Sequence, residues 1–333
     1  MADTLTVAVF HEATNWALPD ALVERIRAAD PSLTVRHARN RAELLDALPE
    51  TNLLIGLPLT DEQLEPHAEH IRWIQLTHSI GDTSPTVDLA LSRGIRITSA
   101  APFRAAQIAE HAMALSLALT RRISTAVRAQ SEHKWTNTRL AQEVRTLDGS
   151  TVGMLAHADV LEHIARRARA FGARTIATGP FDASSDADSV DEHFPMGQLN
   201  DVIAQSDVLI IALPRLGSTI DLIGKRQLGA AKPSTIVIDV SRGGILDQDA
   251  LIDALRRGRI ASAGLDVFRT EPLPETSSLW TMANVIVTPH VSGAAPGYWK
   301  RATTTFCDNL KLLAAQQPLI GELDVAQFQP ARV

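Results

Sequence analysis

The sequence predicts an α/β protein with two Rossmann-like or flavodoxin-like domains built on parallel sheets, one of them discontinuous along the chain. Three observations predict this. The chain has 333 residues, too many for one ordinary hydrophobic core. Short apolar runs alternate with amphipathic segments from end to end, as in parallel sheets covered by helices. The runs are apolar throughout rather than alternating, which is expected of strands buried on both faces.

The elements follow in order along the chain. The predicted strands are residues 6–10, 52–55, 73–76, 95–98, 151–155, 174–177, 208–212, 235–239, 263–267 and 285–288. Apolar residues recur with helical spacing in the segments 21–29, 41–48 and 105–128, the last with almost no helix breaker. A final helix is predicted at 298–315, and the polar stretch 182–191 is predicted to be a loop.

The first domain boundary is expected just before the long helix, near residues 100–102. After the last strand, a loop with Gly and Pro at 291–297 leads into the final helix, which we expect to return to the first domain. The expected domains are therefore 1–100 together with 291–333, and 101–290.

Composition excludes several classes of function. The net charge of -6 argues against a nucleic-acid-binding surface, which needs clustered Lys and Arg. A single cysteine, Cys307, cannot form an internal disulfide. Residues 5–10 are too short and lack the basic flank of a signal peptide, and no apolar stretch is long enough to span a bilayer. We expect a cytoplasmic protein with neither nucleic-acid nor membrane partners.

The segment 151–177 has the size and the strand–turn–helix–strand order of a dinucleotide-binding unit. In the usual G-x-G-x-x-G turn, the glycines allow a tight turn, close approach of the pyrophosphate and close packing of the helix. Ala156, Ala158 and Leu161 occupy those positions here. Leu161 is expected either to push the helix away from the sheet or to reorient and fill space. Gly179 stands where an acidic residue would bind the ribose, and no Arg or Lys directly after it favours a 2′-phosphate.

Polar residues follow the later strands. Arg242 follows the predicted strand 235–239, Asp266 lies near the end of the strand 263–267 with Glu271 just after it, and His290 follows the strand 285–288. Because parallel strands end at one edge of a sheet, these side chains should converge there. A histidine can act as general acid or base at neutral pH, and a neighbouring carboxylate would stabilise its imidazolium. An arginine can hold a substrate carboxylate with two hydrogen bonds and polarise the adjacent carbonyl.

Taken singly, each of these residues has a simpler interpretation: a loop histidine, a surface arginine, a solvated glutamate or a turn aspartate. Their occurrence on successive strand ends favours the joint interpretation. The aromatic residues Trp135, Trp299 and Phe103 are candidates to line a pocket, although packing in the core or on the surface is the simpler role for each.

The ordered combination of motifs resembles the D-isomer-specific 2-hydroxyacid dehydrogenase family from about residue 102 to 293. The first hundred residues resemble it only loosely, so the substrate does not carry over. The motifs are Ala109-Glu-His111, the turn unit described above, Val240-Ser-Arg-Gly-Gly244 with Asp247, Gly264-Leu-Asp-Val-Phe268 with Glu271-Pro272, and Leu279-Trp280 leading to Thr288-Pro-His290.

The resemblance implies an oxidoreductase that uses NAD or NADP, with no metal in its site. It implies Arg242 as the group that binds the substrate, His290 as acid/base and Glu271 as its partner. It also implies a homodimer formed largely through the nucleotide domains. Backbone amides at Ser79, Ile80 and Gly81 would bind the substrate carboxylate, and the implied cofactor-binding residues are Ala158, Asp159, Val160, Pro214, Ser241 and Asp266, the last contacting the nicotinamide amide.

Three hypotheses follow. The first is hydride exchange between NAD(P)H and a small 2-oxo acid or 2-hydroxy acid. The second, motivated by the altered turn, is a non-catalytic relative that has lost the dinucleotide and acts as a binding or regulatory protein. The third is a cleft that holds another adenine-containing or anionic ligand.

Overall fold

The computed structural model describes residues 3–12, 16–77, 85–99, 104–156, 158–179, 189–215 and 219–323. The chain divides into two compact units. Unit 1 combines both ends of the chain, Met1–Arg104 and Ala295–Val333, and unit 2 is the continuous segment Ala105–Ala294. The polar stretch 182–191, expected to be a loop, lies mostly outside the described residues.

Unit 1 is built on a five-stranded parallel sheet. Counted along the chain, its strands lie in the order 2-1-3-4-5, which is the flavodoxin-like order. The strands, in spatial order, are β4 (Thr34–His37), β1 (Thr4–Val7), β5 (Leu53–Ile55), β6 (Trp73–Gln75) and β7 (Arg96–Thr98), and a separate antiparallel pair is formed by β2 (Phe10–His11) and β3 (Trp16–Ala17).

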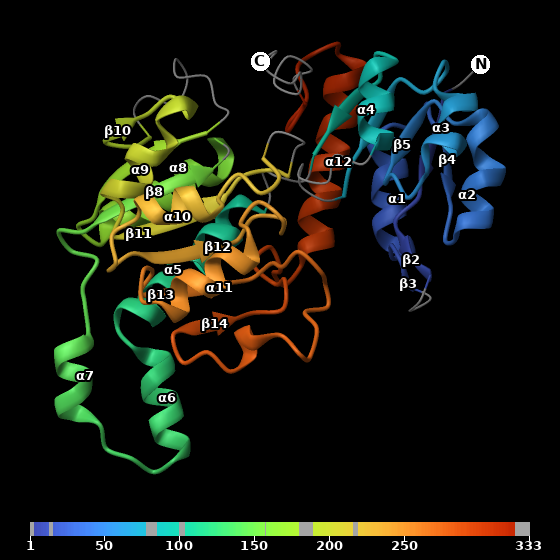
Figure 1. Ribbon diagram of the computed structural model, residues 1–333. Coiled ribbons are helices and arrows are strands. Elements are labelled where there is room, and N and C mark those ends of the chain that lie inside the picture. Colours follow the sequence, from blue (N-terminus) through green and yellow to red (C-terminus); the bar gives the residue numbers. More distant parts are fainter. Residues whose placement is uncertain are drawn as a thin grey trace. The chain divides into compact units, whose positions relative to one another are not determined.

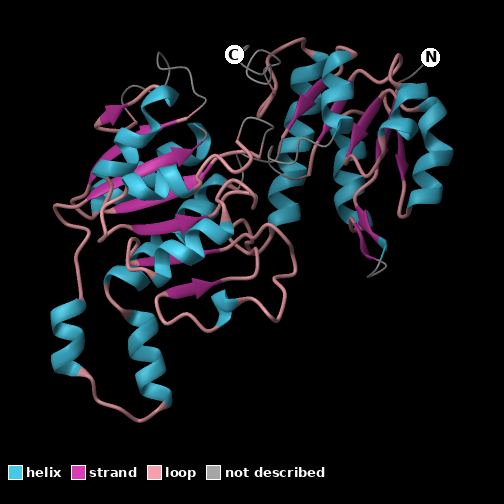
Figure 2. Ribbon diagram, in the orientation of Figure 1, coloured by secondary structure: helices cyan, strands magenta, loops and turns pink. Residues whose placement is uncertain are grey.

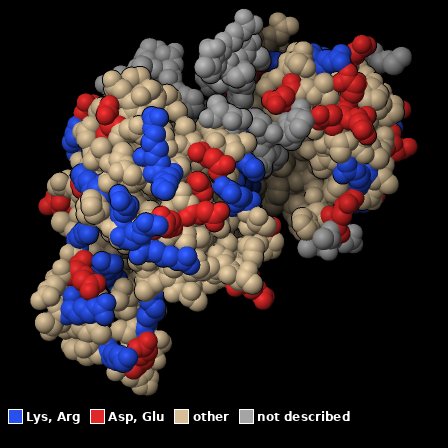
Figure 3. Space-filling view, viewed as in Figure 1, with Lys and Arg blue, Asp and Glu red and all other residues tan. Residues whose placement is uncertain are grey.

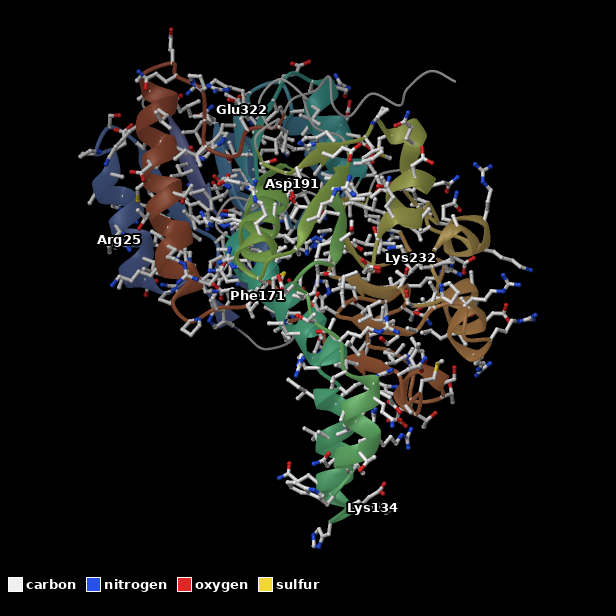
Figure 4. All side chains as sticks on the ribbon, turned by 90° about the vertical axis from the view of Figure 1, so that its left-hand side faces the viewer. Arg25, Lys134, Phe171, Asp191, Lys232 and Glu322 are labelled. Carbon is white, nitrogen blue, oxygen red and sulfur yellow. The ribbon has the colours of Figure 1, made fainter. Side chains whose placement is uncertain are left out.

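The last helix belongs to unit 1. α12 (Tyr298–Ala314) packs on α1 (Asp20–Ala29) and buries Phe306 in the same core as Ile26. Arg25 on α1 donates to Thr304 Oγ1 at 3.0 Å, and Figure 4 shows the two helices side by side. The other helices of this unit are α2 (Arg41–Ala47), α3 (Asp61–Leu64) and α4 (Pro85–Ser92).

Unit 2 is built on a seven-stranded parallel sheet. When these strands are numbered along the chain, they lie side by side across the sheet in the order 3-2-1-4-5-6-7. The order therefore reverses between β8 and β11, which is where doubly wound sheets bind ligands. The strands, in spatial order, are β10 (Glu192–His193), β9 (Arg174–Thr178), β8 (Thr151–Ala156), β11 (Val208–Ala212), β12 (Ile236–Asp239), β13 (Ser262–Leu265) and β14 (Val285–Val287).

Helices cover both faces of this sheet (Figure 2). One face buries a core with α5 (Ala105–Thr120) and α8 (Ala158–Ala170). The other buries a core with α9 (Leu199–Gln205), α10 (Lys225–Ala230) and α11 (Gln248–Arg256). Burial on both faces explains why the central strands of the sequence are apolar at every position.

The expectation of one helix over 105–128 is wrong. α5 ends at Thr120, and Arg122 takes a left-handed backbone with φ 55° before α6 (Ile123–Ser131) begins. The chain returns through α7 (Asn137–Glu143), and the backbone N–H of Arg145 then donates to the carbonyl of Thr120 at 2.8 Å. A tertiary contact thus satisfies the end of α5 and takes the place of a further helical turn.

α6 and α7 form a helical arm that projects from unit 2, with Lys134 at its tip (Figures 1 and 4). Trp135 lies on this arm and is 93% exposed, so it lines no pocket in this structure. Trp299 packs on Trp16 in unit 1, with ring centroids 5.2 Å apart, and Phe103 lies outside the described residues.

On the face seen in Figure 3, the Lys and Arg side chains of unit 2 lie among Asp and Glu side chains. This distribution accords with the mixed composition and net charge of -6. Within the part of the chain that the structure describes, every helix is too short or too polar to cross a lipid bilayer.

Candidate active site

The carboxyl ends of β12, β13 and β14 carry the polar residues singled out in the sequence. These strands are adjacent and parallel, with Asp239 opposite Leu265 and Leu265 opposite Val287. The segments that follow them therefore leave the sheet at the same edge. Arg242, Asp266 and His290 each lie one to three residues beyond the end of one strand.

His290 and Glu271 form a direct pair. Nδ1 of His290 lies 2.6 Å from Oε2 of Glu271, and both side chains are about one-third exposed, at 39% and 33%. The other carboxylate oxygen of Glu271 accepts the backbone N–H of Phe268 at 2.9 Å. The carboxylate is thus held from both sides, and it fixes the plane of the imidazole ring.

Arg242 contacts the opposite nitrogen of the ring. Its Nη1 lies 3.4 Å from Nε2 of His290. An ionised carboxylate only accepts and a guanidinium only donates, so this network assigns the proton of the neutral ring to Nδ1 and a lone pair to Nε2. Nε2 is thereby poised to accept a proton, beside a cation able to hold an anionic group.

His290 has an unusual backbone, with φ 53° in the left-handed region. A non-glycine residue with this conformation carries on the order of 1–3 kcal/mol of strain, so surrounding contacts must hold it. Its N–H donates to the backbone carbonyl of Asp266 at 2.9 Å. The Asp266 side chain accepts the next two backbone N–H groups, those of Val291 at 3.0 Å and Ser292 at 2.8 Å.

Asp266 is fully buried, at 0% exposure. Burial alone would raise its pKa, but hydrogen bonds from the Thr288 and Ser292 side chains and from the backbone of Val291 and Ser292 hold the pKa of this carboxyl below its usual value. Asp266 therefore remains an anion that fastens the loop carrying His290. The sequence had suggested either a turn aspartate or a contact with a cofactor for this residue.

Two further side chains, those of Thr288 and His111, support Asp266. The Thr288 hydroxyl donates to Asp266 Oδ1 at 2.6 Å, and Nε2 of His111 on α5 lies 2.9 Å from the same hydroxyl oxygen. His111 Nε2 is also 3.5 Å from Asp266 Oδ1. Sequence reasoning noted His111 and Thr288 only as parts of family motifs. The available signal was a polar histidine on a helix that is otherwise mostly apolar.

Asp239 was also missed. It ends β12 almost fully buried, where its carboxylate accepts both the backbone N–H and the hydroxyl of Ser241. Burial raises the pKa of Asp239 to about 6; the Ser241 hydrogen bonds oppose this rise, and the carboxylates of Asp266 and Glu271 add to it. A carboxylate at the end of an all-apolar strand was the sequence signal for this group.

The altered turn lies at the carboxyl end of β8, where Ala156 is fully buried and α8 begins. Leu161 is fully buried too, in the core that α8 shares with α5. Ala165 and Ala168 follow it on the same face of α8 and leave room for its larger side chain. Of the two expectations for Leu161, the structure thus has the side chain filling core space.

The other predicted cofactor residues are spread along the same edge. Ala158 and Asp159 open α8, and the Val160 side chain is buried in the core. Pro214 is buried two residues after the end of β11. The Ser241 hydroxyl is buried and donates to Asp239. The predicted substrate residues Ser79, Ile80 and Gly81 lie outside the described residues.

Residues 113–292 match the family model described as "D-isomer specific 2-hydroxyacid dehydrogenase, NAD binding domain". The chain is 33% identical over 278 residues to a D-3-phosphoglycerate dehydrogenase of Mycobacterium bovis, a match that covers 83% of this chain and 52% of the relative. The chain thus spans about half the length of that curated relative.

Two further matches cover more of the compared protein. A glyoxylate reductase of Thermococcus gammatolerans is 27% identical over 283 residues, which covers 84% of this chain and 78% of the relative. The solved structure of a D-isomer-specific 2-hydroxyacid dehydrogenase from Xanthobacter autotrophicus, in complex with NADPH and MES, superposes with a TM-score of 0.80 at 25% identity, covering 97% of this chain and 98% of that one.

Proposed function

The chain belongs to the D-isomer-specific 2-hydroxyacid dehydrogenase family, and we propose that it is an oxidoreductase acting on a small 2-oxo acid or 2-hydroxy acid. The observation that carries the proposal is the continuous chain from Glu271 through His290 to Arg242. The curated relatives support the same reaction class, since they are named phosphoglycerate dehydrogenase and glyoxylate reductase.

Arg242 and His290 suit the two ends of such a substrate. Their closest nitrogens are 3.4 Å apart, so one small molecule can contact both. Arg242 would bind the carboxylate with two hydrogen bonds and polarise the adjacent carbonyl. In the direction of reduction, an imidazolium Nε2–H of His290 gives its proton to the carbonyl oxygen. In the direction of oxidation, the Nε2 lone pair takes the hydroxyl proton.

Glu271 determines which ring nitrogen of His290 exchanges the proton. Its carboxylate accepts from Nδ1 in both protonation states of the ring, so Nε2 is always the nitrogen that exchanges the proton. The positive charge of the imidazolium is balanced at 2.6 Å by the same carboxylate. When bound, NAD(P)H would supply the hydride to the substrate carbon in the direction of reduction, and NAD(P)⁺ would accept it in the direction of oxidation.

The residues at the turn fit a dinucleotide in part. The N-terminus of α8 lies at the carboxyl edge of β8, beside the point where the strand order reverses, and its N–H groups can bind a pyrophosphate. The side chain of Leu161 is buried in the core, so the bulkiest of the three replacements leaves that turn clear. Ala156 and Ala158 each add one methyl group where glycine permits closer approach, so we expect binding weaker than a glycine turn gives.

On this proposal, unit 2 binds NAD or NADP and unit 1 supplies contacts that are specific to the substrate. The assignment of Ser79, Ile80 and Gly81 to the substrate carboxylate stays a prediction, as does a location in the cytoplasm. Asp266 differs from the other predicted cofactor residues, because its carboxylate already accepts hydrogen bonds from the loop at 288–292 in this structure.

We further propose that the protein is a homodimer that uses the arm. Three large apolar side chains on or beside α6 and α7 are exposed: Ile123 at 49%, Val127 at 56% and Trp135 at 93%. A second copy of unit 2 would cover them. Sedimentation at micromolar concentration should give a dimer for the native chain, and Val127→Glu combined with Trp135→Glu should give a monomer. A native monomer would contradict this proposal, and Lys134→Glu at the arm tip is the matched control.

The function is tested by following NADH and NADPH oxidation with glyoxylate, hydroxypyruvate and other 2-oxo acids. We expect turnover with at least one acid, abolished by His290→Ala and retained by His67→Ala, which removes a histidine of unit 1. No oxidation with any acid, together with no cofactor binding, would overturn the proposal and favour the non-catalytic alternative. A thermal-shift screen of adenine-containing and anionic ligands would then address what fills the cleft.

A further inference from the structure

His111 is a polar side chain on a helix that mainly builds core. Its neighbours Ala109, Ala112 and Met113 on α5 are buried, whereas the His111 side chain keeps 21% exposure. Its Nε2 points at Thr288, the residue that precedes Pro289 and His290, at 2.9 Å. α5 thus reaches the segment that carries the acid/base histidine, without touching the reacting atoms.

The hydrogen bonds of this group have one consistent arrangement. Asp266 accepts from two backbone N–H groups and from the Thr288 hydroxyl, so it acts as a carboxylate with acceptors only. The single hydroxyl proton of Thr288 is therefore committed to Asp266. His111 must donate its Nε2–H to the remaining lone pair of that hydroxyl.

The order His111, Thr288, Asp266 then leads to the strained turn. Asp266 holds the N–H groups of Val291 and Ser292, and these fix the chain on the far side of His290, whose φ is 53°. Without the donor on His111, the Thr288 hydroxyl can rotate toward another acceptor. Asp266 would then lose its shortest hydrogen bond, and the left-handed turn would lose part of its support.

We propose that His111 is a positioning residue for the His290 loop: its Nε2–H orients the Thr288 hydroxyl toward Asp266, which holds His290 in its left-handed turn. The catalytic consequence rests on the proposed dehydrogenase function. The structural consequence does not, because it concerns only hydrogen bonds within unit 2.

The test compares His111→Leu, which removes the donor, with His111→Gln, which replaces Nε2–H by an amide N–H. The readout that is independent of activity is hydrogen exchange of the Val291 and Ser292 amides, followed by NMR. His111→Leu should speed their exchange at least about tenfold, whereas His111→Gln should restore the native rates. Glu110→Gln, an exposed change on the same helix, is the matched control and should leave these amides unchanged.

Activity supplies the second readout. His111→Leu should lower kcat about tenfold or more with little change in KM, because a misplaced acid/base group slows proton transfer while the substrate contacts of Arg242 remain. The same substitution in a Thr288→Val background should have no further effect, because the hydroxyl that carries its influence is gone.

Unchanged exchange at Val291 and Ser292 in His111→Leu would overturn the inference, as would equal behaviour of the Leu and Gln variants. A fully additive loss in the double variant would overturn it as well. If the native enzyme shows no turnover, the proposed function fails, and the exchange experiment still decides the role of His111.

Discussion

Restoring the missing glycine of the turn should destabilise this protein. Leu161 is fully buried in the core between α5 and α8, so Leu161→Gly deletes a complete side chain from packed surroundings. Truncating a buried leucine to alanine typically costs about 3–5 kcal/mol, and glycine in a helix adds on the order of 0.5–1 kcal/mol. We therefore expect a loss of roughly 3–6 kcal/mol, a large part of the 5–15 kcal/mol typical of a folded domain.

The assay is urea unfolding followed by far-UV circular dichroism, analysed for two units rather than one transition. Glu162→Gly, at the next and exposed position of α8, isolates the helix effect and should cost no more than about 1 kcal/mol. Leu161→Met keeps the volume and should cost less than about 1.5 kcal/mol. If Leu161→Gly is as stable as the native chain, the packing argument for the altered turn is wrong.

Three further predictions concern carboxylates. The pKa of Asp239 is raised from 3.8 to about 6 by burial, so the free energy of unfolding of the native chain should fall by up to ~3 kcal/mol as pH rises from about 4 to about 6. In urea unfolding, the Asp239→Asn variant should not show that fall and should be more stable than the native chain near pH 8. The pKa of Asp266 is lowered from 3.8, so its contribution to stability is present above about pH 4 and is lost as pH falls further. Asp266→Asn places an amide N–H₂ group against backbone N–H donors of the loop, and it should lower the free energy of unfolding by about 2–4 kcal/mol at neutral pH. In the same assay, the stability of this variant should depend less on pH in the acid range. Glu271→Gln should lower kcat/KM roughly 10–100-fold in the NAD(P)H oxidation assay while leaving thermal unfolding nearly unchanged, because the residue is partly exposed; equal activity would contradict its role as the partner of His290.

Most strands of both sheets were predictable because burial on two faces leaves apolar runs with clear ends, but the edge strands β4 and β10 were missed. β4 was missed, since Thr34 and Arg36 alternate with Val35 and His37 at the edge of the unit 1 sheet, where one face is partly exposed. The break after α5 was missed for another reason. Arg122 adopts a left-handed backbone without glycine, and the contact from Arg145 that ends the helix is a tertiary one.

The site was predictable in outline because parallel strands deliver their following residues to one edge. The hydrogen bonds that support the site were not predictable. Nothing local in Thr288-Pro-His290 signals a positive φ at His290, and the inward direction of Asp266 depends on amides donated by a loop some 25 residues later in the chain. Leu161 is a similar case, because its effect on the turn depended on whether the core behind α8 had room for it.

Cofactor titration tests the central claim most directly. Isothermal calorimetry with purified protein and NADH or NADPH up to millimolar concentration should give saturable binding of one dinucleotide per chain, with the Kd at or below the millimolar range. Addition of a 2-oxo acid should then lead to oxidation of the bound cofactor. The absence of any binding heat or turnover at millimolar cofactor would contradict the account, leaving the chain a family member whose catalytic residues no longer serve a dehydrogenase.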